Sequence, residues 1–269
     1  MSNKVLYISQ EITPYLSSNH MSTIGQKLPQ FAQENGYEVR IFMPKYGSIN
    51  ERRNQLHEVI RLSGMNVIID DTDHPLIIKV ATLQPSRMQV YFIDSDDYFI
   101  HKSISDLEFR LYPEENDERL MFFSYGVIET VKKLRWEPEV VHCQGWFSAL
   151  SPMYIKSLYS DDPTFRNTKV VYSIYGDEFE GELNNRFAEK LEQAGLPAEV
   201  IERLKGQPVT HELLSKIAID YADAVAIASP RASQTLIDYA RSKGKPVMEY
   251  PGDDAGYDSY ITLYNDLLK

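Results

Sequence analysis

The stretch Lys4-Val5-Leu6-Tyr7-Ile8-Ser9-Gln10-Glu11 decides the fold class. Its four consecutive apolar residues predict a short strand that is buried on both faces, as the strands of parallel sheets are. The polar turn that follows leads into a segment of helical period, which begins at about Ser22. A buried strand, a turn and a helix in this order form the first unit of a parallel sheet covered by helices.

The same alternation continues to the end of the chain. Further strands are expected at 37–43, 90–93, 140–142, 169–174 and 224–228, and helices at 117–134, 146–159, 184–194, 211–221 and 257–268. Residues 65–80 have the pattern of a hairpin with its turn at 70–73, and Pro230 is expected at the start of a further helix. No linker divides the chain, so we predict one α/β domain over residues 1–269. Its core is a single Rossmann-like parallel sheet sandwiched by helices.

Composition narrows the class of protein. The chain has 269 residues and a formal net charge of −11, from 28 basic and 39 acidic residues, which argues against a binder of the nucleic-acid backbone. The one cysteine, Cys143, excludes a disulfide within the chain and a cysteine metal cluster. No apolar run has the length of a signal-peptide core or of a membrane span. We therefore expect a cytoplasmic protein without a cofactor, a metal, or a membrane or nucleic-acid partner.

Polar residues that directly follow the predicted strands are the candidates for chemistry, because ligands of open parallel sheets bind at the carboxyl ends of the strands. Glu11 either serves such a site or ties down its loop by accepting hydrogen bonds. His142 is either a substrate-binding group or a core histidine with satisfied hydrogen bonds. Asp177 and Glu178 are either acid/base groups or part of a polar loop. The residues alone leave these alternatives open.

Two other patterns have a simpler structural explanation. Asp94-Ser95-Asp96 has the D-x-D form with which many glycosyltransferases hold the cation of a nucleotide sugar, but in an acidic protein a solvated turn explains it better. His142 and Cys143 could form a nucleophilic pair only if they faced each other. Adjacent residues of a strand point to opposite faces, so packing explains Cys143 better.

Residues 4–15, Lys4 to Tyr15, resemble the start of bacterial and plant glycogen/starch synthases, which are glucosyltransferases of family 5. The similarity continues in order and with compatible spacing through 28–29, 36–46, 90–99, 119–123, 136–154, 173–181, 221–223 and 229–230. It covers about residues 4–235 and is specific to the amino-terminal domain of that family. Residues 236–269 are expected to form a carboxyl-terminal tail with a helix that packs back over the sheet.

The resemblance implies the amino-terminal half of a GT-B glycosyltransferase. It also implies retaining glucosyl transfer from ADP-glucose to an α-1,4-glucan, in glycogen biosynthesis. The residues expected to line the cleft for donor and acceptor are Glu11, His142, Trp146, Tyr175 and Asp177. None of them is assigned a catalytic role, and no metal site is expected.

The sequence departs from the family at three loops. The family's Lys-Thr-Gly-Gly donor motif stands here as Ser17, Ser18, Asn19 and His20. Its His-Asp-Trp stands as Gln144-Gly145-Trp146, and its Ile-His-Asn stands as Ile174-Tyr175-Gly176. These losses predict that glucosyl transfer is impaired, or that it depends on a protein partner that supplies a second domain. The alternative prediction is a non-catalytic module that binds an α-glucan or regulates a synthase.

Overall fold

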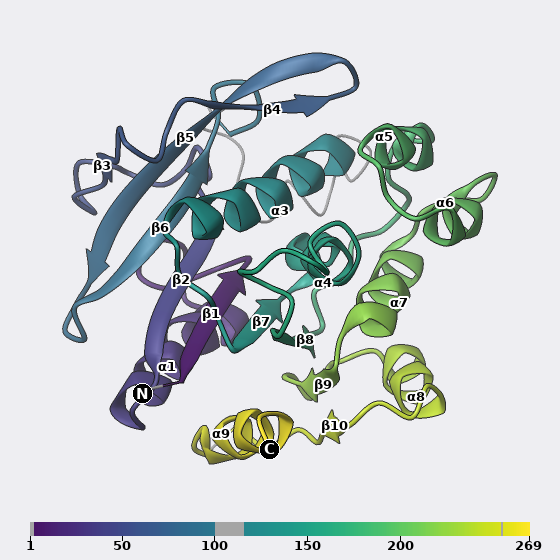
Figure 1. Ribbon diagram of the computed structural model, residues 1–269. Helices are drawn as coiled ribbons and strands as arrows, with labels where there is room; N and C mark the ends of the chain where they lie inside the picture. Colours follow the sequence, from purple (N-terminus) through teal and green to yellow (C-terminus); the bar gives the residue numbers. More distant parts are fainter. Residues whose placement is uncertain (1–2, 100–115, 254) are drawn as a thin grey trace.

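The computed structural model describes residues 3–99, 116–253 and 255–269 (Figure 1). The strands in this part of the chain are β1 (Lys4–Ser9), β2 (Glu38–Pro44), β3 (His57–Glu58), β4 (Met65–Ile69), β5 (Thr72–Leu83), β6 (Met88–Asp94), β7 (Val140–Gln144), β8 (Lys169–Ile174), β9 (Ala224–Ile227) and β10 (Val247–Met248). The helices are α1 (His20–Glu34), α3 (Asn116–Lys133), the 3-10 helix η2 (Trp146–Ser148), α4 (Leu150–Lys156), α5 (Phe187–Gln193), α6 (Ala198–Leu204), α7 (His211–Tyr221), α8 (Gln234–Ser242) and α9 (Asp258–Leu267).

One large sheet organises the molecule, in the order β10-β9-β8-β7-β1-β2-β6-β5-β3, with β4 paired to β5. The strands from β10 to β6 are parallel, and β1 lies between β2 and β7. This part confirms the predicted α/β fold. Beyond β6 the sheet turns antiparallel, because β5 and β6 are joined by a short turn that leaves no room for a crossover helix.

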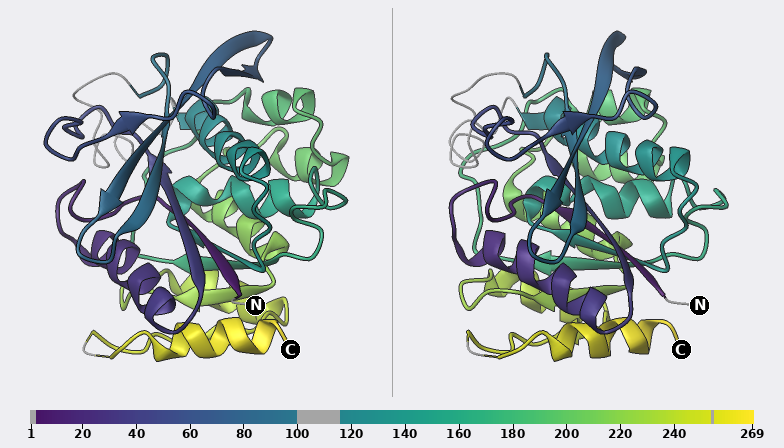
Figure 2. Two further views of the ribbon diagram at one scale, coloured as in Figure 1. Left: turned by 60° about the vertical axis from the view of Figure 1, so that its left-hand side comes forward. Right: turned by 90° about the vertical axis from the view of Figure 1, so that its left-hand side faces the viewer.

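Helices cover both faces of the sheet (Figure 2). α1 and α9 lie on one face, and α3, α4 and α7 lie on the other. Because side chains alternate along a strand, Tyr7 and its register neighbour His142 face α1 and α9. Tyr172 of β8 faces the opposite layer, where its hydroxyl lies 3.3 Å from Ser215 Oγ of α7. The tail helix α9 therefore packs over the sheet.

A local signal explains where α1 begins, and the differences from the sequence prediction are small. Asn19 caps α1 in a reciprocal capping box with Ser22. The helix expected over 146–159 is instead two elements, η2 and α4. Pro230 lies in a turn, and α8 begins four residues later at Gln234. No helix in the described ranges is both long and apolar enough to cross a membrane.

Candidate functional site

Three loops meet at the carboxyl ends of the central strands. Ser9 of β1, Gln144 of β7 and Ser173 of β8 are register neighbours, so these strands end side by side. Gln10 N–H also donates to the Gln144 carbonyl at 3.1 Å, which joins the first two loops directly. The structure thus brings the loops that carry Glu11, Trp146 and Asp177 to one edge of the sheet.

Glu11 joins the loop after β1 to the start of α1. Its carboxylate is fully buried and accepts hydrogen bonds from Asn19 Nδ2 and, at 3.3 Å, from Gln10 Nε2. Such charge-assisted bonds hold a loop firmly. The Asn19 side chain makes a second hydrogen bond, because its Oδ1 accepts from the Ser22 N–H at the first turn of α1.

The neighbouring residues Ser17, Ser18 and His20 also make contacts within the protein. The Ser17 carbonyl accepts from Ser22 Oγ at 2.9 Å, and Ser18 Oγ lies 3.4 Å from Thr23 Oγ1. His20 Nε2 lies 2.7 Å from the Ala228 carbonyl, just after β9. The side chains of Ser17, Ser18 and Asn19 carry no charge.

Gly145 is the position at which the resemblance leads us to expect an aspartate, and its backbone does not suit one. Its φ is +85°, in the left-handed region that favours glycine. A Cβ atom placed there would lie only 2.6 Å from Gln10 Oε1. That oxygen accepts the Phe147 N–H at 3.0 Å, so Gln10 fills the space that a longer residue at position 145 would need.

Asp177 fastens the loop after β8 to its neighbours. Its Oδ2 accepts the Trp146 N–H at 3.0 Å, and His211 Nε2 of α7 lies 3.9 Å from its Oδ1. Trp146 packs edge-on against Phe179, with ring centroids 4.7 Å apart. The Asp177 carboxylate and the Trp146 ring therefore both bind protein groups in the interior.

His142 lies apart from these residues, in the middle of β7. Its Nδ1 lies 2.5 Å from the Tyr264 hydroxyl of α9, and its Nε2 lies 2.6 Å from Ser173 Oγ. Burial lowers the pKa of His142 to about 3, so the imidazole is neutral at physiological pH. Both ring nitrogens bond to buried protein groups, as those of a core histidine do.

Buried donors without a hydrogen-bond partner gather at this end of the sheet. Tyr175 Oη, Gln144 Nε2 and Trp146 Nε1 have none in the described part of the chain. Burial raises the pKa of Tyr175 well above its usual value, so its hydroxyl stays protonated. Each buried donor without a partner costs about 1–3 kcal/mol of folding free energy. Such donors are unusual in a region optimised for packing alone.

The patterns that were weighed as metal or nucleophilic sites are not supported. Asp94 Oδ2 pairs with Lys79 Nζ at 2.8 Å, so its charge is already compensated. No group of three or more His, Cys, Asp or Glu side chains in the described ranges could hold a metal ion. Cys143 is fully buried, and burial raises the pKa of its thiol, which disfavours the reactive thiolate.

The candidate residues share one property, which is burial. The exposed fractions of these residues are zero for Glu11, His142 and Trp146, 3% for Tyr175 and 4% for Asp177. Three tyrosines of the tail contribute to this burial on the α9 side. The Tyr260 and His142 ring centroids are 5.7 Å apart, and Tyr257 packs against Tyr260. In this structure a substrate could reach none of the five side chains without a rearrangement.

Sequence reasoning missed Gln10 and His211 as members of this cluster. Gln10 was within reach of prediction, because it directly follows β1 beside Glu11. His211 begins α7 and contacts Asp177 across 34 positions of sequence. No local pattern indicates that contact.

Comparison with known proteins agrees with the fold and the family resemblance. A family profile described as the starch synthase catalytic domain matches residues 4–245. The glycogen synthase of Chlorobium chlorochromatii is 34% identical over 236 residues, which are 87% of this chain and 47% of that protein. The glycogen synthase of Chlorobaculum tepidum is 36% identical, with the same coverage. The chain thus spans about half the length of these curated relatives.

A solved structure shows the same fold. The catalytic domain of starch synthase IV from Arabidopsis thaliana, bound to ADP and acarbose, matches with a TM-score of 0.70 at 18% identity. The match covers 97% of this chain and 53% of the plant chain. Sequence and fold together show that the chain belongs to the glycogen/starch synthase family.

Proposed function

We propose that this chain serves glycogen metabolism as a synthase-like protein in which glucosyl transfer from ADP-glucose to an α-1,4-glucan is impaired. The observation that carries the proposal is that Glu11, Asn19, Gln10 and Asp177 bind one another or nearby backbone groups in the interior. In an active transferase such groups would be free to stabilise charge that develops on donor and sugar.

Electrostatics at the start of α1 support the same proposal. A pyrophosphate is stabilised by cations and by free N–H groups at a helix N-terminus. Here the Ser22 N–H is already bonded to Asn19 Oδ1, and the buried Glu11 carboxylate lies against the same asparagine. The Glu11 carboxylate would repel a pyrophosphate bound beside it. No lysine occupies positions 17–20 to offset that repulsion.

A transfer assay tests this proposal. The full chain is incubated with ADP-glucose carrying labelled glucose and with glycogen, beside the Chlorobaculum tepidum glycogen synthase as a positive control. We expect no incorporation above that of a heat-denatured sample. Sustained incorporation by the chain alone would overturn the proposal. A mixture of chain and synthase that incorporates more label than the two separately would indicate partner-dependent transfer.

Burial of the strand-end residues also favours a non-catalytic role, either binding of an α-glucan or regulation of a synthase. Calorimetric titration with maltooligosaccharides separates these two. Saturable heat at millimolar sugar supports glucan binding, and the absence of heat excludes it and leaves the regulatory role.

A further inference from the structure

Strand β4 forms an outer edge of the sheet. It pairs only with β5, and the two-residue turn at Asp70 and Asp71 has φ values of 48° and 59°, as in a type I′ hairpin. In such a hairpin the residues that flank the turn exchange backbone hydrogen bonds, and the pattern alternates from there. The N–H and C=O groups of Asn66 and Ile68 therefore point away from β5. Neither residue has a backbone partner on that side in the described chain.

This edge lacks the protection that exposed strands usually have. Edge strands are normally blunted by charged side chains, proline or a bulge. The sequence of β4, Met65-Asn66-Val67-Ile68-Ile69, contains no charge and no proline. The Ile68 side chain is 68% exposed, which makes it one of three large exposed apolar side chains in the described ranges. An edge of this kind is a ready template for another strand.

A cavity lies beside the edge. Its volume is about 320 Å³, and its apolar lining includes Val67, Met121, Tyr125, Tyr154, Leu158 and Ala194. Val67 is on the buried side of β4, toward α3, and Leu158 is 37% exposed at the rim. A strand added to β4 would place the residue opposite Val67 on this same side, because cross-strand neighbours share a face. That side chain would enter the cavity.

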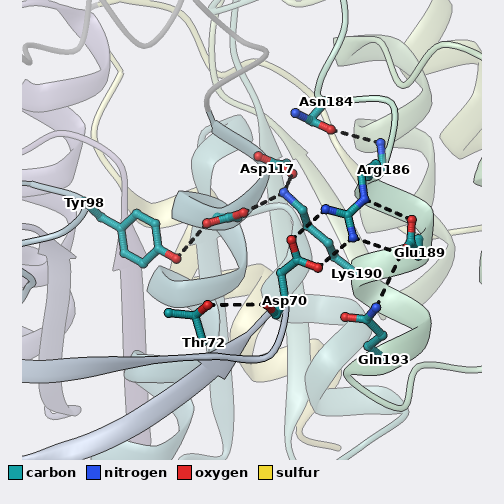
Figure 3. Close-up of polar contacts among 10 residues, drawn as sticks. Asp70, Thr72, Tyr98, Asp117, Asn184, Arg186, Glu189, Lys190 and Gln193 are labelled. Atoms are coloured by element: carbon teal, nitrogen blue, oxygen red, sulfur yellow. Dashed lines mark hydrogen bonds and ion pairs between the residues drawn. The ribbon is translucent and has the colours of Figure 1, made fainter.

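The hairpin turn contacts Arg186, which directly precedes α5 (Figure 3). Both guanidinium Nη atoms of Arg186 donate to the Asp70 carboxylate at 2.7 Å, and the same guanidinium also binds Glu189. Just behind, Lys190 Nζ bridges Asp117 and Glu118 of α3, at 2.6 Å from each. These contacts connect the turn to the start of α5, and α5 to α3.

We propose that β4 and the adjacent cavity bind an extended peptide segment of a partner protein by strand addition. The segment carries an apolar side chain for the cavity and basic residues beside it. Only an extended backbone satisfies the outward groups of Asn66 and Ile68 together. Basic residues are expected in the peptide because they would pair with the carboxylates of Asp71 and Asp73. Neither aspartate has an ion-pair partner in the described chain. The formal net charge of −11 disfavours a second copy as the occupant. This inference does not depend on the proposed function.

Selection from a random peptide library against the full chain tests the proposal. Enriched peptides should alternate apolar residues and carry Lys or Arg. Their affinity, measured by fluorescence anisotropy, should fall at least about tenfold in Ile68→Pro. Proline removes the outward N–H of residue 68, which is not part of the β4–β5 ladder, so the hairpin persists. Hydrogen exchange at the amides of Asn66 and Ile68 should slow when the peptide binds.

A matched pair of variants controls for surface effects. Ile68→Lys should weaken binding of a basic peptide, whereas Ile60→Lys, at an isoleucine that is 83% exposed and outside the cavity, should leave the affinity within about twofold. Circular dichroism confirms that each variant is folded. The proposal is overturned if no peptide is enriched, if Ile68→Pro binds as tightly as the wild type, or if the amide exchange is unchanged. A dimer of the chain that Ile68→Pro abolishes would also overturn it, in favour of a second copy.

Discussion

His142 illustrates how a polar side chain of a β-strand becomes part of the interior. Its burial between Tyr264 and Ser173 keeps the imidazole neutral in the folded protein, with a pKa of about 3, against an ordinary value of 6.5. Below pH 6.5 the unfolded chain therefore binds a proton that the folded chain does not. The stability that the neutral histidine contributes is present above pH 6.5 and is lost as the pH falls toward 3.

A substitution of His142 checks this linkage. His142→Gln should lower the free energy of unfolding by about 1–3 kcal/mol at pH 7, since the Tyr264 and Ser173 hydroxyls lose well-placed partners. The difference between wild type and variant should shrink as the pH falls below 6.5, because only the wild type loses stability through this group. Urea titrations at several pH values measure it. A difference that stays constant with pH would contradict the assignment.

Gly145 yields a second prediction at the residue scale. Gly145→Asp introduces a carboxylate, and it places a side chain at φ +85° and against Gln10 Oε1. We expect a loss of about 1–3 kcal/mol in the free energy of unfolding, measured by urea denaturation. Gly206→Asp is the control, because φ there is +75° and no atom lies near the added Cβ. A smaller loss at Gly145 than at Gly206 would show that Gln10 does not restrict position 145.

At this scale the sequence indicated where polar groups would gather, but not how they would be used. Glu11 and Asp177 were found because each follows a strand, and strand ends meet at one edge of a parallel sheet. Their hydrogen bonds to Asn19 and to the Trp146 N–H join positions that are eight and 31 residues apart. Such contacts depend on how loops pack, which no short-range pattern encodes.

At the scale of elements, α9 is held on the sheet by a small set of tyrosines. Tyr264 is fully buried, lies 2.5 Å from His142 Nδ1 and donates to the Tyr7 hydroxyl at 3.2 Å. Tyr264→Phe keeps the ring and removes only the hydroxyl. We expect a loss of about 1–3 kcal/mol in urea denaturation, with faster hydrogen exchange in α9.

Tyr250→Phe is the matched control for Tyr264→Phe, because the Tyr250 hydroxyl binds the exposed Asp253. Its effect on the free energy of unfolding should be small. Equal losses in the two variants would mean that the buried tyrosine network does not anchor α9.

Lys190 joins α5 to α3, and it gives a further prediction for these elements. Lys190→Met would leave the Asp117 carboxylate, which is 4% exposed, without its counter-charge. Burial already raises the pKa of Asp117. We expect a loss of about 3–5 kcal/mol in the free energy of unfolding. Arg186→Met, one turn earlier on the surface, should have little effect. Similar losses for both variants would contradict the role given to burial.

Elements with a strong hydrophobic period were predicted well, and those set by tertiary contacts were not. α3 lies within one residue of the range expected from its apolar stripe. The hairpin was found, but β5 begins at Thr72, because the turn needs only Asp70 and Asp71. α6 and β10 were missed, since a seven-residue helix and a two-residue strand carry too little periodicity to stand out.

At the scale of the whole molecule, the many buried tyrosines predict a limit at alkaline pH. The chain has 18 tyrosines, and burial raises the pKa of Tyr7, Tyr154 and Tyr172 above the ordinary value of 10.0. Burial lowers the pKa of Lys190, but its ion pairs with Asp117 and Glu118 outweigh that effect, so the pKa of Lys190 is raised as well. Groups with a raised folded pKa contribute stability below their unfolded pKa and lose it as the pH rises.

The free energy of unfolding should therefore fall steadily above about pH 10. Tyrosinate absorbance, followed with circular dichroism during a pH titration, measures this. Most tyrosines should ionise together with unfolding. Stepwise ionisation of nearly all of them in a folded protein would contradict the burial described here.

The family and the central parallel sheet could be inferred from the sequence. The patterns that indicate them, buried strands and the polar segments after them, each lie within a short stretch of residues. The closure of the candidate site could not, because it arises when residues from β1, β7, β8 and α9 come together. The loops after β1, β7 and β8 are those whose polar groups bind one another.

The most direct measurement of the central claim is hydrogen exchange of the full chain with and without millimolar ADP-glucose. The segments to follow contain Glu11, Trp146 and Asp177. We expect ADP-glucose to leave exchange in these segments unchanged, while the Chlorobaculum tepidum synthase shows protection at the matching positions. Saturable protection of the same segments in this chain would contradict it, because it would show that the strand-end site opens and binds the donor.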